Sequence, residues 1–140
     1  MNFRLTISSV DLYLLHAPYG GKEGRLGAWK ALVEAVEAGK VRSIGVSNYG
    51  VHHLEELETY IKDVDSKEGS GKGGVLSVNQ VELHPWLPRP DIVSWCEKRG
   101  VALEVGSGAE RFGIGTVLTC PRLTAHLCER PRWMTKNWYL

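Results

Sequence analysis

The first strong pattern in this chain is an apolar run that stops abruptly at polar residues. Residues 11–15 read DLYLL, His16 follows directly, and Pro18 cannot continue a central strand. The apolar positions lack the clean alternation of a half-exposed strand, which is typical of a parallel strand covered on both faces. The pattern therefore predicts a buried strand with the imidazole of His16 near its carboxyl end.

Further apolar runs alternate with segments of helical spacing. Trp29, Leu32, Val33 and Val36 recur at i, i+3, i+4 and i+7, the period of an amphipathic helix. Segment 63–74 has six Gly or Ser residues and no apolar period, so we expect a flexible loop there. The same patterns predict strands at Val41–Val46, Val75–Leu83 and Val101–Val105, and helices at Leu26–Ala38, Val51–Lys62 and Asp91–Arg99. This alternation predicts βαβ units and a parallel sheet.

Composition and charge narrow the class of protein. With 43% hydrophobic and 24% charged residues in 140, the chain falls in the range of globular domains. A formal net charge of +1 gives no reason to expect nucleic acid or an anionic membrane as a partner. Cys96, Cys120 and Cys128 lack metal-ligand spacing, and no apolar run approaches the roughly 20 residues that span a bilayer. We therefore expect a soluble, cytosolic (cytoplasmic) protein without a metal site.

Three motifs together resemble one known family. They are DLYLLH at residues 11–16, GKVRSIGVSN at residues 39–48 and VNQVELHP at residues 78–85. In this order they are similar to the strand-4, strand-5 and strand-6 signatures of the aldo-keto reductases, which are NAD(P)H-dependent oxidoreductases built on a (β/α)8 barrel. A complete barrel usually needs about 250 residues. The resemblance therefore implies an α/β fold that is a partial (β/α)8 TIM barrel of about four parallel βα units, followed by an irregular tail.

The resemblance also divides the chain into two parts. Residues 1–108 are expected to form the partial aldo-keto reductase barrel, and residues 109–140 a divergent, poorly ordered tail. Within the first part, Gly69–Gly74 superficially resembles a phosphate-binding loop. Ser66 stands where that motif requires its first Gly, and Gly73 where it requires Ser or Thr. We therefore assign this run to the flexible loop.

The polar residues at the strand ends each have a functional and a structural interpretation. The resemblance implies that a neutral His16 imidazole hydrogen-bonds the substrate carbonyl oxygen, whereas its position alone favours a core histidine satisfied by a neighbouring carbonyl. The resemblance also implies that Ser47, Asn48 and Gln80 hold the nicotinamide carboxamide of NADP, bound as NADPH. The structural alternatives are a helix cap for Ser47 and Asn48, and a loop hydrogen bond for Gln80.

The resemblance further indicates which groups are missing. The family works with a tetrad of Asp, Tyr, Lys and His, and only His16 lies in the part that this chain matches. Where the family has a Tyr that stacks on the nicotinamide, the chain reads VGSG at residues 105–108. The implied reaction is reduction of a small carbonyl substrate, an aldehyde or ketone, to an alcohol, but we expect this chain alone to be inactive. The alternative is a non-catalytic truncated product, or an interaction protein that self-associates through the open edges of its sheet.

Overall fold

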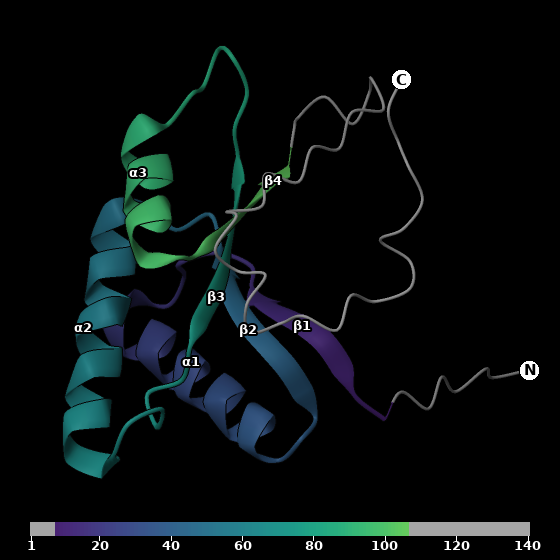
Figure 1. Cartoon of the computed structure of the whole chain (residues 1–140), viewed down its shortest axis with the longest axis vertical. Coiled ribbons are helices and arrows are strands. Elements are labelled where there is room, and N and C mark those ends of the chain that lie inside the picture. Colours follow the sequence, from purple (N-terminus) through teal and green to yellow (C-terminus); the bar gives the residue numbers. More distant parts are fainter. Residues whose placement is uncertain (1–7, 107–140) are drawn as a thin grey trace, which may run out of the picture.

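The computed structural model describes residues 8–106, and strands and helices alternate throughout that range (Figure 1). In chain order the elements are β1 (Val10–Leu15), α1 (Gly21–Glu37), β2 (Val41–Ser47), α2 (Val51–Glu68), β3 (Leu76–Glu82), α3 (Pro90–Arg99) and β4 (Ala102–Gly106). Each strand begins and ends within one residue of the limits predicted from its apolar run. The expectations for residues 109–140 lie outside the described residues.

The strands of the described region form one parallel sheet in the order β1-β2-β3-β4. Each strand pairs with the next one in the chain, and the three connecting helices lie together on one face of the sheet (Figure 1). In the register, Leu15 lies opposite Val46, Ser47 opposite Gln80, and Gln80 opposite Glu104. The predicted parallel α/β architecture is confirmed, and the carboxyl ends of its strands meet at one edge.

The apolar core lies between the sheet and the helices. Trp29 of α1, Leu54 of α2 and Ile92 of α3 are between 0% and 2% exposed. The indole N–H of Trp29 donates a buried hydrogen bond of 2.9 Å to the Gly73 carbonyl, so its polar group is satisfied. Burial of apolar surface contributes about 25 cal/mol per Å². One large side chain from each helix therefore stabilises the docking of that helix on the sheet.

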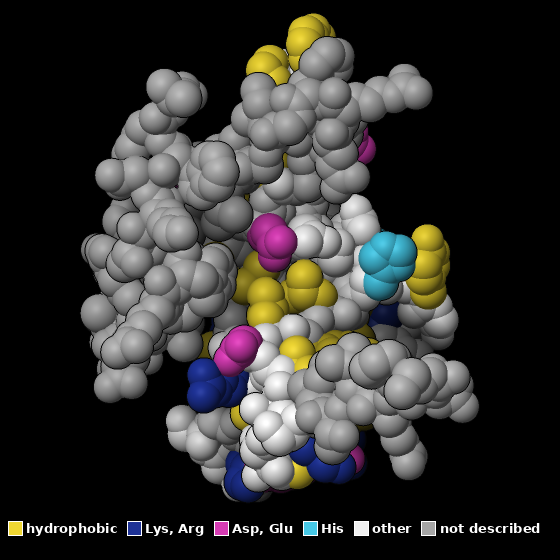
Figure 2. Space-filling view, turned by 90° about the vertical axis from the view of Figure 1, so that its right-hand side faces the viewer, with side chains coloured by type: hydrophobic (Ala, Val, Ile, Leu, Met, Phe, Trp, Pro, Cys, Tyr) yellow, Lys and Arg dark blue, Asp and Glu magenta, His cyan; other side chains and the backbone are white. Residues whose placement is uncertain are grey.

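The opposite face of the sheet carries a second apolar row. Leu14, Gly45, Val78 and Ala102 lie side by side in the register. Figure 2 looks onto this face and shows hydrophobic side chains at its centre with acidic side chains beside them. A Cβ atom on Gly45 would collide with the Val78 carbonyl oxygen and approach Leu14 Cδ2 to 2.8 Å. The glycine is therefore what allows β2 and its neighbours to pack this closely.

Helix α1 is longer than its apolar pattern predicted. It begins at Gly21 rather than Leu26, because Gly20 enters with a left-handed φ of 79° that starts the helix early. Trp29, Leu32 and Val33 are the buried residues of α1, and all three follow the predicted start. Apolar spacing therefore could not reveal the first turn.

Helix α2 also exceeds its predicted end, so the expectation of a flexible loop from residue 63 is wrong for residues 63–68. The helix runs to Glu68 rather than Lys62. Lys67 Nζ lies 2.7 Å from Asp63 Oδ2, one helical turn away. Asp65 Oδ1 accepts a 2.7 Å hydrogen bond from the Gly73 backbone N–H, which ties the last turns of the helix to the loop that follows. Polar contacts stabilise these last turns of α2. The spacing of apolar residues gives no sign of such contacts, so it could not predict them.

Candidate functional site

The carboxyl edge of the sheet brings together the four residues predicted to form a site. Ser47 ends β2 opposite Gln80 of β3, and His16 follows β1 directly. The side-chain Nδ2 of Asn48 donates a 2.9 Å hydrogen bond to the backbone carbonyl of His16. Three successive strand ends are thus joined by contacts between residues more than thirty positions apart.

An ordered chain of hydrogen bonds connects the three polar side chains. Asn48 Nδ2 donates to Ser47 Oγ at 3.1 Å, and Ser47 Oγ donates to Gln80 Oε1 at 3.3 Å. Among the described residues, the side-chain oxygen of Asn48 and the side-chain nitrogen of Gln80 make no further hydrogen bond. The Asn48 oxygen can therefore accept a hydrogen bond from a ligand, and the Gln80 nitrogen can donate one. These two groups match the N–H and C=O groups of a primary carboxamide.

The backbone at Asn48 has a conformation that suits this arrangement. Its φ is 59°, in the left-handed region that asparagine tolerates better than most residues. Its N–H donates a 2.8 Å hydrogen bond to the Gln80 carbonyl. Ser47 is only 4% exposed, whereas Asn48 lies at the surface. The turn therefore places a polar side chain at the exposed end of a buried strand.

The structure excludes two of the structural alternatives. The ring of His16 is exposed, so it is not a core histidine. Helix α2 is capped at Gly50, whose carbonyl accepts from the N–H groups of His53 and Leu54, and no side chain caps it. Ser47 and Asn48 therefore do not serve as its cap. The side-chain hydrogen bond of Gln80 differs from the loop contact considered for it, since its oxygen accepts from Ser47, the last residue of β2.

Behind the site lies an ion pair that the sequence analysis missed. Arg25 of α1 binds Glu56 of α2 through two nitrogens, with Nη2–Oε1 and Nε–Oε1 distances of 2.8 and 3.0 Å. Both side chains are largely buried, at 12% and 14% exposed. Arg25 Nη1 also donates a 3.4 Å hydrogen bond to the Pro18 carbonyl. The pair therefore ties the loop after His16 to the helix that follows Asn48.

Three titratable groups, of which Tyr49 and His53 lie beside this ion pair, do not have the properties of acid catalysts. Burial raises the pKa of Tyr49, which is 2% exposed. Burial, reinforced by the charges of Arg25 and His52, lowers the pKa of His53, which favours the neutral ring. Burial also raises the pKa of the Cys96 thiol to about 11, which leaves it a poor nucleophile.

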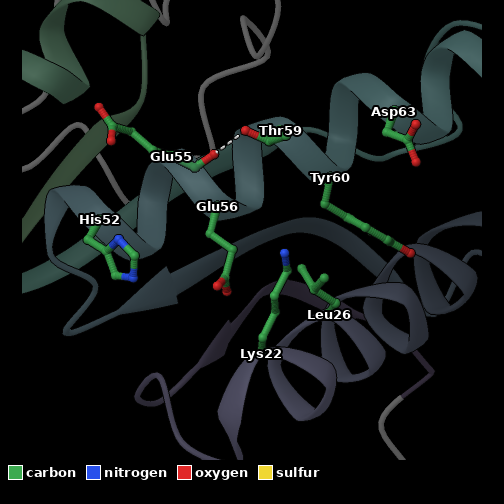
Figure 3. A pocket seen from close by; sticks show the side chains of 8 residues that line it. All are labelled: Lys22, Leu26, His52, Glu55, Glu56, Thr59, Tyr60 and Asp63. Atoms are coloured by element: carbon green, nitrogen blue, oxygen red, sulfur yellow. Dashed lines mark hydrogen bonds between the residues drawn. The ribbon is translucent and has the colours of Figure 1, made fainter.

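A separate groove of about 570 Å³ lies between α1 and α2 (Figure 3). Glu56 and Lys22 face each other across it, from α2 and α1 respectively (Figure 3). The carboxylate of Glu56 is already occupied by Arg25. The groove is lined by Lys22, Leu26, His52, Glu55, Glu56, Thr59, Tyr60 and Asp63, and none of the four strand-end residues belongs to it. It is therefore distinct from the strand-end site.

Residues 8–106 contain no cluster of metal ligands and no helix that could span a membrane. In that range no three His, Cys, Asp or Glu side chains lie close enough to hold a metal ion. No helix in this described part of the chain is long and apolar enough to cross a bilayer.

Comparison with known sequences places this geometry in a family. A profile described as Aldo/keto reductase family matches residues 1–107. An uncharacterised oxidoreductase of Schizosaccharomyces pombe is 44% identical over 98 residues, which are 70% of this chain and 31% of the relative. The glyoxal reductase of Bacillus subtilis is 42% identical over 104 residues, which are 74% of this chain and 33% of the enzyme. The chain thus spans about a third of the length of the curated relatives it matches.

Solved structures agree with the sequence comparison. An aldo/keto reductase from Brucella melitensis superposes with a TM-score of 0.60 at 34% identity, covering 74% of this chain and 36% of that one. A variant of Gox0644 in complex with NADPH superposes with a TM-score of 0.56 at 36% identity, covering 71% of this chain and 32% of that one. The four parallel strands and the three helices that connect them are therefore part of a TIM barrel, as the sequence predicted. The chain belongs to the aldo/keto reductase family of oxidoreductases, whose members include proteins that bind NADPH.

Proposed function

We propose that the strand-end site binds the nicotinamide carboxamide of NADPH, in a protein that reduces aldehydes or ketones to alcohols. The observation that carries this proposal is the hydrogen-bonded chain from Asn48 through Ser47 to Gln80. It leaves one acceptor on Asn48 and one donor on Gln80, which a primary carboxamide can pair at once. The NADPH complex of a relative supports the choice of cofactor. Because the chain spans about a third of its relatives, the reaction is proposed for the whole protein.

The exposed imidazole of His16 has the role of orienting the substrate. When bound, NADPH supplies the hydride that reduces the carbonyl carbon. The His16 ring would donate a hydrogen bond to the carbonyl oxygen, on which negative charge develops during reduction. Tyr49 does not provide the proton that completes the alcohol, because its phenol is buried and its pKa is raised. We expect the proton donor to be a tyrosine, which is the residue that the family resemblance implies for this role.

NADPH binding by the 140-residue chain tests the cofactor site. We expect the fluorescence of NADPH to change on titration with the chain, and Gln80→Leu to weaken binding about fivefold, the equivalent of one net hydrogen bond of about 1 kcal/mol. Ser77→Ala is the matched control. Ser77 is also on β3, but its hydroxyl contacts only the nearby Val75 carbonyl, at 3.5 Å. Equal affinities for Gln80→Leu and the wild-type chain would contradict the proposal.

A second candidate function is that of a non-catalytic, self-associating protein. Within the described region, β1 and β4 each pair with a neighbouring strand on one side only. Such edges present unpaired backbone groups to a further chain. The two candidates differ in turnover. Oxidation of NADPH by the purified chain with a simple aldehyde, lost in His16→Ala, would favour the reductase, whereas no turnover together with association would favour the second candidate.

A further inference from the structure

The fully buried amide of Asn79 is the most unusual polar group in the described part of the chain. Asn79 lies at the centre of the sheet, opposite Val46 of β2 and Leu103 of β4, and is 0% exposed. Its side-chain oxygen has no hydrogen-bond partner within residues 8–106. Burial of an unsatisfied polar atom is unfavourable, so packing of the core alone does not account for an amide at this position. The amide needs another explanation than stability.

The hydrogen bond made by the amide nitrogen of Asn79 suggests what the residue does. Asn79 Nδ2 donates a buried hydrogen bond of 3.0 Å to the backbone carbonyl of Tyr49. Tyr49 directly follows Asn48, the residue with the left-handed φ of 59°. On the other side of the same turn, the Asn48 N–H donates to the Gln80 carbonyl at 2.8 Å. Two consecutive residues of β3 therefore hold the peptide group that precedes Asn48 and the peptide group that follows Tyr49.

The side chains of Asn79 and Gln80 lie on opposite faces of β3, so they make different contacts. Side chains of neighbouring strand residues point to opposite faces of a sheet, so Asn79 and Gln80 reach different sides of the turn. The side chain of Gln80 contacts Ser47 at 3.3 Å, and the side chain of Asn79 contacts Tyr49. Gln80 belongs to the proposed carboxamide site, whereas Asn79 is separated from that site by the backbone of the turn.

The structure assigns Asn79 as a positioning residue that holds the Asn48 turn in its left-handed conformation and so orients the Asn48 side chain toward the carboxamide. This inference rests on the proposed cofactor site. Asn79 itself does not touch cofactor or substrate. Asn79 acts on the turn only by its hydrogen bond to the Tyr49 carbonyl. Loss of this Nδ2–O bond should loosen the turn while leaving the sheet intact.

Asn79→Leu tests the assignment, because leucine has nearly the shape of asparagine and lacks its donor. We expect hydrogen exchange of the Asn48 backbone N–H, followed by NMR, to accelerate about fivefold, and the dissociation constant for NADPH to rise about fivefold. Val46→Ala is the matched control. It destabilises the same row of the core but leaves the Nδ2–O bond in place, so after correction for global stability neither quantity should change.

The possible outcomes separate this inference from the proposed function. Unchanged Asn48 exchange in Asn79→Leu, or an equal change in Val46→Ala, would overturn the positioning role. Failure of the wild-type chain to bind NADPH would reject the proposed cofactor site, and the exchange rates would still decide whether Asn79 holds the turn. Should Asn79→Leu fail to fold, Asn79→Ser provides the same comparison, because its hydroxyl is too short to span the 3.0 Å bond now made by Nδ2.

Discussion

Gly45 allows β2 to approach its neighbouring strands closely on both sides. A Cβ atom there would collide with the Val78 carbonyl oxygen and lie 2.8 Å from Leu14 Cδ2. Gly45→Ala must push the strands apart, and overpacking of this kind typically costs 1–3 kcal/mol, so we expect a loss of about 2 kcal/mol in the free energy of unfolding, measured by urea denaturation. Gly27→Ala is the control, since a Cβ at this site in α1 meets nothing within 4 Å. It should stabilise the protein by about 0.5–1 kcal/mol, and equal effects of the two substitutions would refute the packing argument.

Helices α2 and α3 are joined by a side-chain contact whose strength depends on pH. Arg99 binds both carboxylate oxygens of Glu58, at 2.9 and 3.1 Å, while its guanidinium lies 4.2 Å from the centre of the Trp95 ring. Hydrogen bonds from Arg99 and Lys62 lower the pKa of Glu58 below its ordinary value of 4.5, although burial opposes them. The folded state therefore favours the carboxylate. Its contribution is present above pH 4.5 and is lost as the pH falls through the lowered pKa.

Glu58→Gln should consequently flatten the dependence of stability on pH below about 4.5. At pH 7 the loss should stay below about 1 kcal/mol, because the pair is partly exposed to solvent. Denaturation curves recorded from pH 3 to pH 7 measure both effects. Glu97→Gln, an exposed carboxylate on α3, is the control and should leave the pH dependence unchanged. A parallel shift of the whole curve in Glu58→Gln would argue against the linkage.

The whole described sheet ends at two strands whose outer edges have no partner among residues 8–106. Val10 and Tyr13 of β1 are 37% and 51% exposed. Because unpaired strand edges associate, we expect the chain to show a mass above 15.6 kDa by light scattering, and Tyr13→Lys to reduce it. Val75→Lys changes an equally apolar, 70% exposed residue that lies outside the strands, and should have no such effect. A monodisperse monomer with a cooperative melting transition would exclude self-association.

The sequence by itself determined the order of the elements and the place of the candidate site. Apolar runs that end at His16 and Ser47 mark two strand ends, and Gln80 lies near the end of the third strand, because buried parallel strands are made mainly of apolar residues. The alternation of periods then requires parallel strands, which bring those ends to one edge. The three motifs also identified the family correctly.

Only the tertiary structure decided which atoms meet. The bonds from Asn79 to Tyr49, from Asn48 to His16 and from Arg25 to Glu56 join residues about thirty positions apart. Local periodicity records burial over a few neighbouring residues and carries no information on such partners. For the same reason the polar extension of α2 was missed, and so was the role of a buried asparagine that sequence alone shows only as an interruption of an apolar strand. Hydrogen bonds depend on distance and direction in space, and these exist only once the chain has folded.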